Sequence, residues 1–163
     1  MKWVGVVGRR ISALAAVVAA VALGGCDNDE GSSRGGSPEQ AGEACVSPDD
    51  CYPDVADPTL LAGAVECLDR VQDGYCTHQC DTDADCCAVP GECDTPLPQV
   101  CAPFESTGLR MCFLSCEQDA LDQAEAAGFE FTDDAAFCQR YAHPRFGCRS
   151  TGGGSENRKV CVP

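Results

Sequence analysis

The sequence contains few of the residues that build a conventional hydrophobic core. Residues 45–163 hold twenty-one Leu, Val and Phe in all and no Ile. That share is under about a fifth of the segment, a level that together with a high net charge is typical of disordered chains. Burial of aliphatic side chains is therefore excluded as the sole source of a stable fold.

Basic residues and histidine are also scarce. The chain has 11 Lys and Arg against 26 Asp and Glu, a formal net charge of −15, so nucleic acid and anionic membrane surfaces are poor partners. It has 2 histidines and lacks the Gly-x-Ser-x-Gly motif of serine hydrolases. These absences disfavour an enzyme and a nucleic-acid-binding protein, and no cofactor is expected.

Cysteine, by contrast, is abundant, with 15 in the chain and fourteen of them in residues 45–163. That density exceeds the roughly 8–10% that marks a disulfide scaffold. Disulfides of about 2–4 kcal/mol each can substitute for a thin core in an exported chain. We therefore predict a small disulfide-rich fold with seven disulfides, whose pairing the sequence leaves open. The fourteen cysteines are Cys45, Cys51, Cys67, Cys76, Cys80, Cys86, Cys87, Cys93, Cys101, Cys112, Cys116, Cys138, Cys148 and Cys161.

The start of the chain is typical of an export signal. A basic segment, residues 1–10, precedes an apolar run at residues 11–23 that is too short to span a bilayer comfortably. The sequence LGGC at residues 23–26 resembles the lipobox of bacterial lipoproteins, in which the cysteine receives lipid and becomes the mature N-terminus. This resemblance implies a signal peptide at residues 1–25 and lipid on Cys26. A plain secretory signal and an uncleaved anchor are the alternatives.

Lipidation of Cys26 would also explain why the number of cysteines is odd. Its sulfur would form a thioether, which leaves fourteen thiols to pair and none free as a catalytic nucleophile. Residues 27–44 have no large apolar side chain and are rich in Gly, Ser and acids, as in a flexible tether. We predict a lipidated tether at residues 26–44 and one disulfide-rich domain at residues 45–163, on the periplasmic face of a bacterial membrane or at the cell surface.

The cysteine spacing indicates two related units, at about residues 74–103 and 110–163. Each contains a Cys-x3-Cys pair and three further cysteines, the last of which opens a Cys-x-Pro motif. Because five is odd, at least one cysteine of each set must bond outside its unit, so the units should be crosslinked. Adjacent Cys86 and Cys87 should have separate partners, since a ring across one peptide bond is strained. The two sets are Cys76, Cys80, Cys86, Cys93 and Cys101, and Cys112, Cys116, Cys138, Cys148 and Cys161.

This cysteine frame resembles the cysteine-rich lipoproteins of myxobacteria and related deltaproteobacteria. The likeness lies in GYCT at residues 74–77, Cys80 and DADC at residues 83–86, and it covers about residues 74–163. That family is largely uncharacterised, so the resemblance implies an extracytoplasmic location and a disulfide-rich architecture but no activity.

Short hairpins and three short helices are expected between the cysteines. The helices are predicted at residues 57–73, 115–127 and 132–143, and a turn is predicted at residues 151–154. The first helix would begin at an Asp-Pro pair, the second at a Ser-x-x-Gln capping box and the third at Thr-Asp-Asp. Glycine or proline follows each of them.

Three alternating carboxylates, Asp81, Asp83 and Asp85, could be ligands for calcium, with Glu92 at the position of the last EF-hand ligand. However, Cys86 occupies the position of the required glycine, and prolines and cysteines replace the flanking helices. A solvated acidic loop is therefore the favoured interpretation, and no metal site is predicted.

The interval between Cys116 and Cys138 is the candidate binding segment. It is sixteen residues longer than the interval between Cys80 and Cys86, and loops held by a rigid scaffold are where binding tends to occur. Its aromatic residues could anchor a partner, or they could fill the thin core. The candidate binding residues are Phe129, Phe131, Arg140 and Arg145.

Together these features favour a lipid-anchored extracytoplasmic module that binds a protein partner or contributes structure to the envelope. One alternative is a disulfide-stapled protease inhibitor, for which a rigid exposed loop between cysteines would serve. A calcium-binding module is a further alternative.

Overall fold

The computed structural model describes residues 42–104, 108–152 and 157–163. The predicted signal peptide, Cys26 and most of the predicted tether lie outside these residues, as does part of the turn predicted at residues 151–154. Within the described ranges, no helix is long and apolar enough to cross a membrane.

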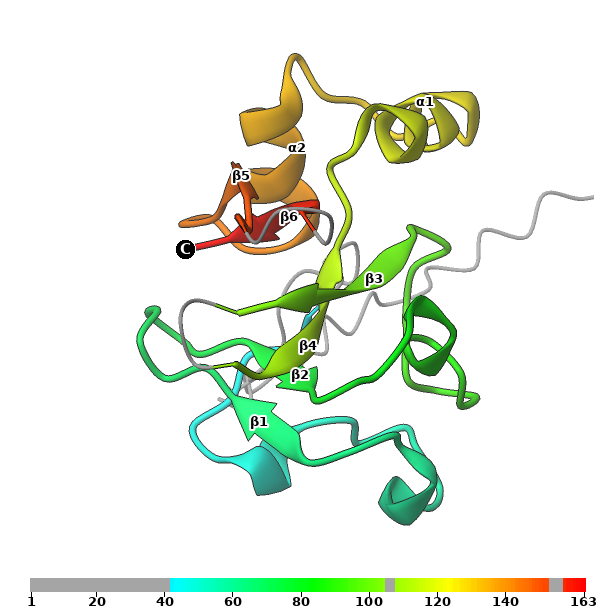
Figure 1. Ribbon diagram of the computed structural model, residues 1–163, viewed down its shortest axis with the longest axis vertical. Helices are drawn as coiled ribbons and strands as arrows, with labels where there is room; N and C mark the ends of the chain where they lie inside the picture. Colours follow the sequence, from blue (N-terminus) through cyan, green and yellow to red (C-terminus); the bar gives the residue numbers. More distant parts are fainter. Residues whose placement is uncertain (1–41, 105–107, 153–156) are drawn as a thin grey trace, which may run out of the picture. The chain divides into compact units, whose positions relative to one another are not determined.

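The described residues form short elements joined by turns (Figure 1). There are two α-helices, three 3-10 turns (η) and six strands among them. In chain order they are η1 Pro48–Asp50, η2 Pro58–Leu60, β1 Val65–Cys67, β2 Cys76–His78, η3 Asp83–Asp85, β3 Gln99–Pro103, β4 Arg110–Leu114, α1 Gln118–Ala126, α2 Asp134–Tyr141, β5 Gly147–Ser150 and β6 Lys159–Val162.

The strands of the described residues pair as three antiparallel hairpins, β1–β2, β3–β4 and β5–β6. Isolated bridges, from Gln79 to Met111 and from Ser115 to Val160, join each hairpin to the next. In every hairpin a cysteine of the first strand lies opposite a cysteine of the second. These opposed pairs are Cys67 and Cys76, Cys101 and Cys112, and Cys148 and Cys161.

All fourteen cysteines from Cys45 onward form disulfides, as their density predicted. The pairs are Cys45–Cys67, Cys51–Cys76, Cys80–Cys101, Cys86–Cys112, Cys87–Cys93, Cys116–Cys148 and Cys138–Cys161. Cys86 and Cys87 have separate partners, as predicted, and Cys86–Cys112 joins residues of the two predicted units.

The pairing divides the domain into three repeats rather than the two units that the spacing predicted. Repeat one is residues 45–76, repeat two is residues 80–112 and repeat three is residues 116–161. In each, the first cysteine of the frame bonds the third and the second bonds the fourth. The two-unit frame is therefore not confirmed, because it started at the last cysteine of repeat one and included Cys93, which pairs with Cys87 outside the frame.

Repeats one and two share a further feature, a turn between their first two cysteines that an aspartate caps. In repeat one, Asp50 accepts hydrogen bonds from the backbone N–H groups of Val46 and Ser47, at 3.0 and 2.9 Å. In repeat two, Asp85 accepts the equivalent bonds from Asp81 and Thr82, at 2.9 and 2.7 Å. The shared motif is Cys-x-Ser/Thr-x-x-Asp-Cys.

The helix predicted at residues 57–73 is wrong beyond its first turn. Asp57 does accept a hydrogen bond from the backbone N–H of Thr59, but the turn ends at Leu60 and Val65–Cys67 is strand β1. The cap was therefore identified correctly. The helix does not continue because pairing with β2 and the Cys45–Cys67 disulfide hold this segment extended.

The other two predicted helices are present as α1 and α2, and both begin later than predicted. Glu117 rather than Ser115 is the N-cap of α1, because Ser115 pairs with Val160. Gly128, at φ +90°, ends α1 as expected. The side chain of Asp133 caps α2 by accepting from the backbone N–H of Ala136 at 2.7 Å.

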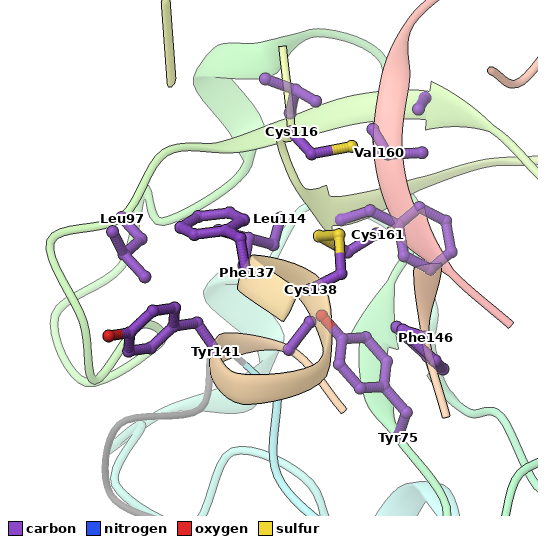
Figure 2. Close-up of a cluster of buried hydrophobic side chains, with 14 of the residues drawn as sticks. Tyr75, Leu97, Leu114, Cys116, Phe137, Cys138, Tyr141, Phe146, Val160 and Cys161 are labelled. Atoms are coloured by element: carbon purple, nitrogen blue, oxygen red, sulfur yellow. A yellow bond between two sulfur atoms is a disulfide. The ribbon is translucent and has the colours of Figure 1, made fainter. Parts of the chain in front are cut away.

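Most of the apolar interior is a single cluster around α2 (Figure 2). Phe137, Cys138 and Tyr141 point inward from this helix and are at most 2% exposed. They belong to the same cluster as side chains from all three hairpins and from the segments that flank them, among them Tyr75, Phe113, Phe146 and Val160. Elsewhere in the described residues, two smaller clusters consist chiefly of cystine, one in repeat one and one in repeat two.

Candidate functional site

The segment between Cys116 and Cys138 distinguishes repeat three from the other two. It has twenty-one residues, whereas five separate the first two cysteines of repeats one and two. Cys116–Cys148 and Cys138–Cys161 hold its two ends, and it contains α1 and the first half of α2 (Figure 1). We call residues 117–137 the α-insertion.

The two phenylalanines proposed as anchors, Phe129 and Phe131, pack inward. Phe129 contacts the ring of Tyr141 edge-on at 5.2 Å, and Phe131 contacts Phe137 edge-on at 4.9 Å. Both are half-buried against the main cluster. The structure thus places them in the core-filling role that the sequence left as the alternative to an aromatic anchor.

A groove of about 230 Å³ lies between the end of α1 and α2. Tyr141 lines it, and the Tyr141 hydroxyl accepts from the backbone N–H of Glu130 and donates to the Glu130 carbonyl, at 3.0 and 2.9 Å. The Arg140 guanidinium lies 5.3 Å from the centre of the Tyr141 ring. The groove is lined by Ala127, Gly128, Phe129, Glu130, Arg140 and Tyr141.

The four candidate binding residues do not form one site. Phe129 and Arg140 share the groove, but Phe131 does not line it. Arg145 lies beside Gln72, with a guanidinium nitrogen 3.4 Å from the Gln72 amide oxygen. Sequence proximity suggested a single cluster, and the turn that follows α2 separates Arg145 from it.

A second groove, of about 420 Å³, lies where α1 begins beside the start of β6. Arg158 crosses it and pairs with Glu117 at 3.1 Å and with Asp83 at 2.9 Å. The pair with Asp83 connects repeat two to repeat three, and the pair with Glu117 lies within repeat three. The groove is lined by Glu117, Gln118, Asp119, Asn157, Arg158 and Lys159, so it carries both signs of charge.

The three carboxylates considered for calcium have separate surroundings. Asp85 caps η3, and Asp83 accepts from the backbone N–H of Cys101 and pairs with Arg158. Hydrogen bonds from the backbone N–H groups of Thr82 and Asp81 lower the pKa of Asp85 below its ordinary value. Among the described residues, Asp81, Asp83 and Asp85 do not bring their oxygens together at metal-ligand distances.

Glu92, the fourth carboxylate of the calcium alternative, instead forms a buried pair with His78. Its carboxylate lies 2.9 Å from Nε2 of His78, which is 0% exposed. Nδ1 of His78 faces the carbonyl oxygens of Ala62 and Gln79, at 2.7 and 2.8 Å. Both ring nitrogens therefore face oxygen atoms. No local pattern reveals the pair, because fourteen positions separate its members and the fold alone joins them.

No family model, curated protein or solved structure matches the chain. The seven disulfides indicate an oxidising, extracytoplasmic environment.

Proposed function

We propose that this protein is a lipid-anchored extracytoplasmic module of the bacterial envelope that binds a protein partner through the α-insertion. The observation that carries the proposal is the contrast between twenty-one residues in repeat three and five at the equivalent position of the other two repeats. An insertion between fixed crosslinks presents new surface without disturbing the scaffold, and binding residues concentrate in such segments.

The exposed face of α1 is the proposed contact surface. Its buried face consists of Ala120 and Ala124, and its exposed face carries Asp119, Asp122 and Glu125. The helix contains no basic residue. A partner that presents basic side chains is complementary to it, and because these contacts are exposed they would mainly raise the association rate.

The anchor rests on the LGGC motif at residues 23–26. Cys26→Ser should yield an unprocessed precursor that incorporates no labelled fatty acid and leaves the membrane fraction after alkaline extraction. A Cys26→Ser protein that matures and fractionates like the unmodified chain would show that the anchor is wrong.

The binding surface is tested by removing its charge without touching the core. The variant Asp119→Asn, Asp122→Asn, Glu125→Gln should lose at least about tenfold in crosslinking yield to its partner in intact cells, as expected for several rim charges acting together. The matched control removes three exposed acids from repeats one and two, through Asp49→Asn, Asp69→Asn and Asp94→Asn. Equal yields from both variants would refute the assignment of the surface to α1.

A further inference from the structure

One disulfide, Cys87–Cys93, lies outside the threefold frame. It closes a sequence separation of 6, whereas the six disulfides of the repeats close separations of 21 to 32. No hairpin holds its two cysteines opposite each other. The repeats therefore do not depend on it for their pairing.

This disulfide is also the accessible one. Cys87 is exposed and Cys93 is half-buried, whereas each disulfide of the repeats includes at least one buried cysteine and no exposed one. Cys87 also has φ +61°, in the left-handed region that non-glycine residues rarely adopt. Access by an incoming thiol limits thiol–disulfide exchange, so Cys87 is where such a thiol would arrive.

The surroundings of the disulfide favour release of Cys93. The side-chain amide of Gln99 donates to Sγ of Cys93 at 3.1 Å, and a donor at this position stabilises a departing thiolate. Glu92 is the nearby carboxylate. Its carboxylate oxygens are engaged by the backbone N–H groups of Cys87 and Val89 and by Nε2 of His78.

The loop keeps other anchors when the disulfide opens. Glu92 binds its backbone at two N–H groups. Gly91, at φ +86°, lies so close to the carbonyl oxygen of Asp54 that an added Cβ would be 2.4 Å from it. Reduction would therefore weaken the contact of this loop with repeat one without releasing the loop, and the hairpins would stay in place.

We propose that Cys87–Cys93 is a thiol–disulfide exchange site, which an extracytoplasmic dithiol reduces while the six disulfides of the repeats stay intact. One thiolate of the dithiol attacks Sγ of Cys87, the bond to Sγ of Cys93 breaks, and Cys93 leaves as a thiolate that takes up a proton. The second thiolate of the dithiol then attacks the dithiol's first sulfur in the mixed disulfide. Cys87 is released as a thiolate that takes up a proton. Two electrons pass from the dithiol to the cystine, and the reductant becomes a disulfide. This site is separate from the α-insertion.

The test is partial reduction of the full-length oxidised protein with dithiothreitol, followed by acid quenching, alkylation and peptide mapping. Labels at Cys87 and Cys93 should appear about tenfold faster than at any other pair, because exposure and a stabilised leaving thiolate both raise the exchange rate. Hydrogen exchange of the singly reduced form should speed up at residues 87–93 and around Asp54, and β3–β4 should keep its protection. Earlier labelling of another pair, or simultaneous labelling of all pairs, would overturn the proposal.

The double variant Cys87→Ser, Cys93→Ser is the matched control. It should lose the fast phase of labelling and keep the slow phases at unchanged rates. If a fast phase remains in this variant, the reactive disulfide lies elsewhere. If the variant does not fold, the repeats need this disulfide, which contradicts the proposal.

Discussion

In repeats one and two the space between the crosslinks is filled chiefly by cystine, whereas repeat three places an aromatic helix there. The cluster of repeat two consists of Cys80, Cys86, Cys101 and Cys112, and that of repeat one is built on Cys45, Cys51 and Cys76. Repeat three has the same two crosslinks, but Phe137 and Tyr141 of α2 lie beside them (Figure 2). One disulfide frame thus supports two kinds of interior.

The difference shows why the frame tolerates an insertion. The cysteines that flank the α-insertion are bonded to β5 and β6, so its ends stay fixed whatever lies between them. Closing a longer loop costs little extra entropy, about 0.6 kcal/mol for each doubling of length. The added residues then contribute the first half of α2, the helix around which the main apolar cluster forms.

If repeat three depends on its aromatic interior, Phe137→Ala should have the largest effect. Phe137 is 0% exposed and contacts Phe131 and Tyr141, so its loss should reduce the free energy of unfolding by about 3–5 kcal/mol, measured by urea denaturation. Phe131→Ala, at a half-buried position, serves as the control and should cost less. Equal losses would mean that the helix does not form the centre of the cluster.

Removal of equivalent disulfides tests the comparison directly. Cys86–Cys112 and Cys138–Cys161 close similar separations, 26 and 23, so in the chain-entropy model each contributes a similar amount, about 3 kcal/mol. The Ala/Ala variant of the first should nevertheless be the less stable, because the cluster between the crosslinks of repeat two consists of cystine alone. Hydrogen exchange should show η3 and β3–β4 opening in that variant, and α2 should stay protected in the other. If α2 opens as readily as η3, the two interiors are equivalent.

The capped turns should respond alike to acid. The folded-state pKa of Asp85 lies below its ordinary value of 3.8 because the backbone N–H groups of Thr82 and Asp81 donate to it. Its contribution to stability is therefore present above that pH and is lost as pH falls through the lowered pKa. Asp85→Asn should weaken the dependence of the melting temperature on pH below about pH 4. Asp50→Asn should also weaken this dependence if the turn of repeat one is equivalent. If only one of the two substitutions has an effect, the two turns are not equivalent.

The smallest effect is expected where repeats two and three are joined by exposed charges. Arg158 pairs with Asp83 and Glu117, whose side chains are 48% and 38% exposed. Arg158→Gln should cost about 0.5 kcal/mol at low salt and almost nothing at high salt, because exposed pairs are weak and screened. Arg149→Gln, on the exposed side of β5, should leave stability unchanged under both conditions. A salt-independent loss for Arg158→Gln would mean that this residue acts through packing.

Some features of the fold follow from local sequence. The density and parity of the cysteines predicted a disulfide-rich domain, and the strain of a vicinal ring predicted separate partners for Cys86 and Cys87. The glycine after α1 and the aspartate before α2 predicted the bounds of these helices to within a few residues. These predictions hold because capping, ring strain and redox chemistry depend on neighbours in the chain.

Other features were decided by tertiary structure. Residues 57–73 have helical periodicity, but β1 forms there because pairing with β2 and a disulfide to Cys45 outweigh local propensity. The threefold frame was missed for the same reason. The spacing of Cys76 and Cys80 suggested that they belong to one unit, but their partners, Cys51 and Cys101, assign them to different repeats. The His78–Glu92 pair and the inward packing of Phe129 and Phe131 also required the fold. The sequence by itself determined how many crosslinks the domain has, and the tertiary structure decided what they connect, because pairing is fixed by which sulfurs the folded backbone brings within bonding distance.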